Sequence, residues 1–167
     1  MSWFNNDGLL VKFGTEKTVA NRGGEYRRNG KLREVELTIN LASLTQGEVI
    51  QSDQVFFPAG ARIVRTTVQT NIAAATGTAI DVGLVRMDRT TEIDFDGILA
   101  AFVTASMNTV GELSILQKDV TIPTGLAGTG ALHSIPTTFV GYITASMTDA
   151  TSFTAGQIVI TIQYYMP

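Results

Sequence analysis

The chain has 167 residues, which is one domain's worth of sequence, and only 16% of them are charged, against about 25% in an ordinary soluble domain. It contains no cysteine and a single histidine, His133, which excludes disulfides, cysteine-ligated metals and thiol nucleophiles. The net charge of −3 provides no overall positive field, so we expect no nucleic-acid partner.

Threonine takes the place of many of the missing charges, with 23 residues. A surface rich in threonine and other small polar residues suits burial against neighbouring proteins better than isolation in water. The longest apolar run, 98–103, is far shorter than the roughly 18 residues of a membrane span. The N-terminus lacks the basic start and apolar stretch of a secretory signal. We therefore expect no membrane partner and no export.

The N-terminal segment 1–31 shows no sustained hydrophobic period and is predicted to be an extended arm. One short strand is expected at 9–13. Trp3 and Phe4 lie at the tip of the arm, and a large aromatic side chain stabilises a fold or a complex only when it is buried. We therefore expect them to dock in an apolar pocket of this chain or of a neighbour.

Charge is distributed unevenly along the chain. Residues 1–36 hold seven of the twelve basic side chains together with five acids, whereas residues 120–167 contain one formal charge, Asp149. Such asymmetry indicates different contacts for the two ends of the chain. A solvated arm followed by a β domain is the simpler explanation of the basic residues.

Residues 32–167 are predicted to form a single all-β domain, an antiparallel, jelly-roll-like β-sandwich. Alternating apolar and polar residues predict strands at 32–41, 48–57, 61–72, 79–87, 112–120, 137–147 and 157–166. In the third of these strands, Val64, Val68 and Ile72 are expected to face the core. One short helix is expected at 98–107, because alanine is frequent there.

The acidic segment 88–97 is the best candidate for a metal site. Glu92, Asp94 and Asp96 alternate along it and imitate the start of a calcium-binding loop. The twelfth position of such a loop requires a bidentate glutamate, and here it is Val103. We therefore favour a solvated hairpin loop and keep Ca²⁺ binding as the weaker alternative.

No other pattern predicts catalysis or a cofactor. The glycine-rich segment 125–130 lacks the Lys-Ser/Thr pair that follows a phosphate-binding loop. No spacing supplies a serine with a base and an orienting carboxylate, and His133 is expected to be exposed or a local hydrogen-bond donor. Tyr142, Tyr164 and Tyr165 are the candidates for stacking a sugar if the chain were a glycan-binding module.

Several segments of the chain follow a known pattern of strands and turns. They occupy 57–63, 77–84, 94–98 and 154–165. Over about residues 55–167 the chain resembles the small β-sandwich structural proteins of tailed bacteriophages, of the head decoration or cement type. The resemblance implies a non-enzymatic virion protein without a cofactor, assembled in the host cytoplasm onto the outer surface of the capsid. It carries over no catalytic residue.

The resemblance also implies the partners, namely the major capsid protein and further copies of this chain in a trimer or a dimer. The residues expected to make these contacts are apolar at the tip of the arm and basic towards its end: Trp3, Phe4, Leu9, Leu10, Phe13, Arg22, Arg27, Arg28 and Arg33. Two alternatives stay open. One is another virion role, such as a head-fibre base, a head–tail protein or a tail protein, and the other is the glycan-binding module.

Overall fold

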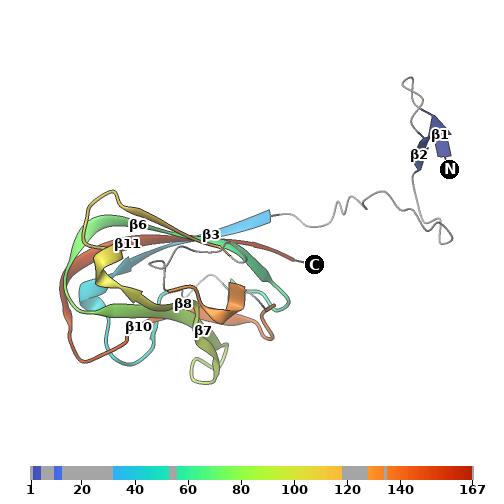
Figure 1. The fold of residues 1–167 in the computed structure, drawn as a ribbon. Coiled ribbons are helices and arrows are strands. Elements are labelled where there is room, and N and C mark those ends of the chain that lie inside the picture. The colour runs from blue at the N-terminus through green and yellow to red at the C-terminus, as the bar shows by residue number, and fades with distance from the viewer. Residues whose placement is uncertain are drawn as a thin grey trace.

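The computed structural model describes residues 2–4, 10–12, 32–52, 56–117, 128–133 and 135–166. Throughout these parts the regular structure is β-strand, interrupted by short 3₁₀ turns. The strands form two facing layers (Figure 1), which confirms the predicted all-β sandwich. No helix in the described parts is long and apolar enough to cross a membrane.

Each layer is an antiparallel sheet, named here after one of its inner strands. The β11 sheet has the order β3 (Leu32–Asn40), β11 (Phe153–Tyr165), β6 (Arg62–Thr76) and β9 (Leu113–Gln117). The β10 sheet has the order β4 (Val49–Ile50), β10 (Gly141–Met147), β7 (Ala79–Arg86) and β8 (Glu92–Val103), and β5 (Phe56–Phe57) also pairs with β10. A separate two-stranded sheet joins β1 (Ser2–Phe4) to β2 (Leu10–Lys12).

The strand order of the sandwich is that of a jelly roll. When β4 and β5 are counted as one position, the first strand of the described sandwich, β3, pairs with the last, β11. The second position pairs with the next-to-last strand, β10. This wrapping of the chain ends around the middle is the topology of double-sheet jelly rolls.

The core forms where the alternation of the sequence is cleanest. Ile158, Ile160 and Ile162 of β11 are fully buried, and the apolar positions of β3 face the same way. Burying each such side chain contributes on the order of 1.5–3 kcal/mol. The intervening side chains on β3 are exposed, so the predicted face of this strand is confirmed.

The predicted core face of β6 is wrong at both ends. Val68 is buried, but Val64 and Ile72 are 40% and 52% exposed. The pairing with β11 shifts once near the start of β6 and three times towards its end. An extra residue in a strand turns the following side chains to the other face. The bulges therefore place two apolar side chains on the surface.

The helix expected at 98–107 is also wrong. The strand β8 continues to Val103, and only a single 3₁₀ turn, η2 (Thr104–Ser106), follows it. Phe102 pairs with Ile80 of β7 and is fully buried. Pairing and burial outweigh the modest helix preference of alanine, because propensity differences are fractions of a kcal/mol per residue.

β8 contains a large bulge, in which it has several more residues than the strand it pairs with, β7. Val82 pairs with Leu99, yet Leu84, two residues further on, pairs with Asp94. The additional residues of β8 cross β7 at Gly83, where a Cβ atom would overlap the backbone of Asp94 and Phe95. Glycine at this position therefore makes the bulge sterically feasible.

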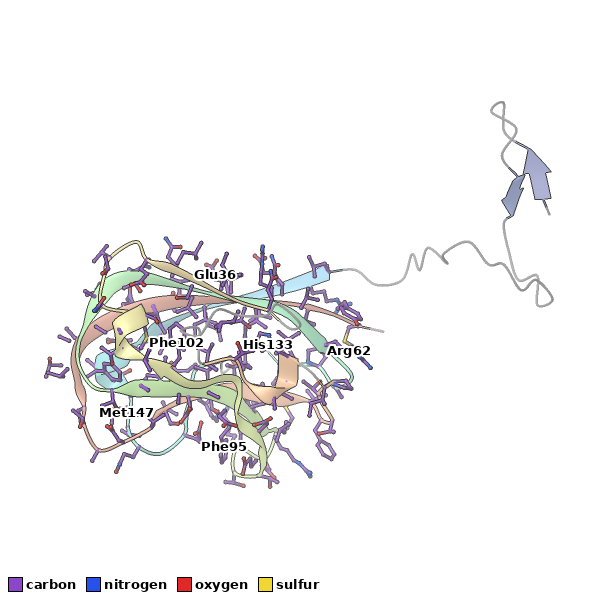
Figure 2. The ribbon with its side chains drawn as sticks, viewed as in Figure 1. Glu36, Arg62, Phe95, Phe102, His133 and Met147 are labelled. Atoms are coloured by element: carbon purple, nitrogen blue, oxygen red, sulfur yellow. The ribbon has the colours of Figure 1, made fainter. Side chains whose placement is uncertain are left out.

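His133 links the two layers at the 3₁₀ turn η3 (Ala131–His133). It is only 3% exposed, and its Nε2 lies 3.1 Å from Oγ1 of the buried Thr66 on β6. Figure 2 shows His133 and Phe102 between the two sheets and Glu36 on an outer surface. The expectation of an exposed histidine is thus wrong, because the turn carries the side chain into the core. Burial lowers the pKa of His133 below its usual value of 6.5.

We expect Gly83→Ala to destabilise the sandwich by about 1–3 kcal/mol, because the added methyl overlaps backbone that has no room to move. Gly47→Ala is the matched control, since a Cβ atom there has only Thr45 Oγ1 as a neighbour, at 3.9 Å. Urea unfolding of the two variants measures the difference. Equal stabilities would contradict the proposed role of Gly83.

We expect the buried His133 to make the protein less stable in acid. Its folded-state pKa is lowered, so this contribution is complete above about pH 6.5 and is lost as the pH falls. In His133→Gln the side chain cannot titrate. The difference between the free energies of unfolding of the wild type and the variant should therefore decrease as the pH is lowered from about 7.5 to about 5. Parallel pH profiles would contradict this assignment.

Candidate functional site

The predicted contact residues of the arm fall mostly outside the part of the chain that the structure describes. Trp3 and Phe4 belong to β1, and Leu10 belongs to β2. Leu9, Phe13, Arg22, Arg27 and Arg28 lie outside the described residues. Arg33 is in β3 and exposed. The contacts expected of these residues stay predictions.

The acidic segment 88–97 is a hairpin turn at its start and a strand over the rest of its length. In the turn, Oδ1 of Asp88 accepts hydrogen bonds from the backbone N–H groups of Thr90 (2.9 Å) and Thr91 (2.8 Å). Glu92, Asp94 and Asp96 follow within β8. In the described parts, no group of three or more acidic or histidine residues is arranged to hold a metal ion, so the calcium alternative gains no support.

The β8 bulge nevertheless brings carboxyl groups together. Partial burial, a hydrogen bond with Asp96 and the charges of Asp96 and Glu92 raise the pKa of Asp94 to about 6. Burial, and then the charge of Asp96, also raises the pKa of Asp81, whose Oδ1 accepts a hydrogen bond from Ala101 N at 2.7 Å. The raised pKa of Asp94 reflects this crowding, because its protonation removes one of the neighbouring negative charges.

Aromatic and arginine side chains gather near the β7–β8 hairpin. The Tyr142 ring lies 5.2 Å from the Phe56 ring, and the Arg89 guanidinium lies 5.0 Å from the Tyr142 centroid. The Arg86 guanidinium lies 3.6 Å from the Phe139 centroid. We call these five residues the aromatic–arginine cluster.

The pairing of β10 assembles this cluster. Tyr142 pairs with Phe56 of β5, and Gly141 pairs with Arg86 of β7. Phe56 and Phe139 remain 45% and 44% exposed. Exposed aromatic rings beside arginine are typical of the residues that dominate protein–protein binding energies. The sequence analysis missed the cluster because its members come from three separate segments without a shared motif.

The outer face of the β11 sheet is a second broad surface with little charge at its centre. The register places Thr161 beside Thr67 and Val159 beside Gln69. Leu113 and Ile115 of β9 continue this face and are exposed. Charged side chains occur towards its margin, where Gln163 Nε2 donates to Glu34 Oε2 at 2.8 Å.

The tyrosines proposed for sugar stacking do not form an exposed row. Tyr142 and Tyr164 are buried, and only Tyr165, at 36% exposure, reaches the surface appreciably. The ring of Tyr164 packs against that of Phe57, with centroids 4.7 Å apart and planes tilted by 48°. Since a sugar platform needs open ring faces, the proposed set of three tyrosines is wrong.

Comparison with known proteins identifies similar folds only. No family model matches the chain, and no curated protein matches it. The chain is similar to one in the structure of the Cyanophage Pam1 capsid asymmetric unit, with 10% identity and a TM-score of 0.52 over 94% of this chain and 100% of that chain.

Two further capsid structures give lower TM-scores. A chain in the capsid of Ralstonia phage GP4 is 11% identical, with a TM-score of 0.49 over 91% of this chain and 94% of that one. A chain in the acidic stable capsid of Helicobacter pylori bacteriophage KHP30 is 14% identical, with a TM-score of 0.48 over 81% and 88%.

We expect Asp94→Asn to stabilise the protein at neutral pH and to have little effect below about pH 4. The raised pKa of Asp94 means that the folded state loses stability as the pH rises from the ordinary value of 3.8 through about 6. The gain near pH 7 should be about 1 kcal/mol, less than the full shift implies, because the group is partly solvated. Urea unfolding at both pH values measures it, and an unchanged stability near pH 7 would contradict the raised pKa of Asp94.

Proposed function

We propose that this chain is a non-enzymatic structural protein of a bacteriophage virion. In this proposal it decorates the outside of the capsid shell and cements it by bridging neighbouring major capsid subunits. The observation that carries the proposal is the jelly roll itself, whose similarity to the Cyanophage Pam1 capsid chain spans 94% of this chain and all of the other.

The surface chemistry supports a role in assembly. The centre of the outer face of the β11 sheet carries threonine, glutamine and aliphatic side chains. Such groups cost less free energy to desolvate than ionised ones. The aromatic–arginine cluster adds ring faces and guanidinium groups, which supply large binding energies when a partner covers them.

The buried histidine supports a non-enzymatic role. His133 is the one histidine of the chain, and its ring is enclosed between the sheets beside Thr66. A general base must be within hydrogen-bond reach of its substrate, and this ring is not. The chain also has no cysteine that could act as a nucleophile.

The position and copy number of the chain in purified virus particles test the proposal. Immunogold labelling should show many copies spread over the outer shell. Labelling at a single vertex or along the tail would replace decoration by one of the other virion roles. Absence of the chain from purified particles would overturn the virion role itself.

We expect Phe139→Ala to weaken binding to capsids depleted of this chain by about tenfold or more, because it removes an exposed ring of the aromatic–arginine cluster. Val110→Ala is the matched control, since Val110 is an exposed apolar residue outside the cluster. Cosedimentation with capsids measures binding, and urea unfolding verifies that both variants fold. Equal binding by the two variants would exclude the cluster from the contact.

A further inference from the structure

The strand β3 leaves a long edge of the β11 sheet open. In the described part of the chain β3 has a neighbour on one side only, β11. Nine consecutive residues of β3 pair with β11 without a register shift, so the edge is straight. Unpaired backbone groups along such an edge are a template for another strand.

The other edges in the described residues are shorter or obstructed. β9 has five residues, and β4 and β5 have two each. β8 is longer, but it is bulged, and its outer side is partly covered where Ala100 N donates to Gly128 O at 2.9 Å. The edge of β3 is therefore the best receptor for an added strand.

A segment of the arm has the pattern of a strand that would fit this edge. Leu9, Val11 and Phe13 alternate with Leu10 and Lys12. An added strand with this alternation would extend the buried row of β3 with three apolar side chains. Among the residues that the structure describes, β2 pairs with β1 alone, through three residues on each strand, and so small a two-stranded sheet is not stable alone in water.

Charge favours the same contact. Residues 1–31 carry six basic and three acidic side chains, whereas residues 32–167 carry six basic and twelve acidic ones. The arm therefore has a charge of +3 and the sandwich a charge of −6. On β3 itself the exposed side chains include Glu34 and Glu36, opposite in sign to Lys12.

We propose that the arm segment 9–13 of one copy of this chain adds as a strand to the open edge of β3 in a second copy. Among the described residues of one chain, β2 pairs with β1 and no strand pairs with the outer edge of β3. Residues 14–31 can span roughly 60 Å when extended, about twice the length of a nine-residue strand. The arm can therefore reach beyond its own sandwich to a neighbour. This contact joins copies of the chain and does not depend on the proposed virion role.

The absence of native cysteine allows a clean cross-linking test in the full-length protein. One variant carries Leu10→Cys in the arm, and a second, with a different tag, carries Thr38→Cys on β3. The two are mixed and treated with a short bismaleimide, which reaches between neighbouring positions of paired strands without demanding one register. Thr109→Cys is the matched control, because Thr109 is exposed and precedes β9 at the opposite edge of the same sheet.

The expected result is a cross-linked pair of differently tagged chains from Leu10→Cys with Thr38→Cys, and loss of this product with Thr109→Cys. Adding Lys12→Glu to the arm variant should reduce the yield. Equal yields with both partners, or none with either, would overturn the proposal. A double variant of Leu10→Cys and Thr38→Cys that cross-links only within single chains would show that the arm pairs with its own edge, which also overturns it.

Discussion

The pairing of β3 with β11 holds the structure together. It joins residues 129 positions apart, as in the Gln163–Glu34 hydrogen bond, and it places β11 between β3 and β6. Without it the fully buried isoleucines of β11 would lose half of their neighbours in the sheet, and the β11 sheet could not cover the β10 sheet. This pairing closes most of the chain into one loop, so the chain loses conformational entropy before the contacts between the two strands can stabilise it. We therefore expect folding to be slow compared with that of proteins whose contacts are local.

Bulges decide much of the chemistry of the surface. Gly83 lets the backbone of β8 cross over β7, and the crossing brings Asp94 and Asp96 together on β8. The bulges at the two ends of β6 turn Val64 and Ile72 outward. In each case one strand has more residues than its partner, so the side chains beyond the extra residue change the face of the sheet to which they point.

The surfaces that remain open differ in chemistry and suit different contacts. The outer face of the β11 sheet is broad and almost uncharged at its centre, so it can be covered at low desolvation cost. The aromatic–arginine cluster offers a compact set of ring faces and cations. The edge of β3 offers backbone hydrogen bonds, which recognise an extended strand with little regard to its sequence. A shell protein that touches several neighbours would use all of them.

The sequence by itself determined the all-β class, the β-sandwich and the inward faces of β3 and β11, because each of these follows from local alternation of apolar and polar residues. It also determined the low charge and its concentration near the N-terminus. Only the tertiary structure decided that residues 98–103 extend β8, that His133 is buried against Thr66, and that the five residues of the aromatic–arginine cluster come together. These features depend on which distant strands pair and where a register shifts, and no local pattern encodes a contact between residues tens of positions apart.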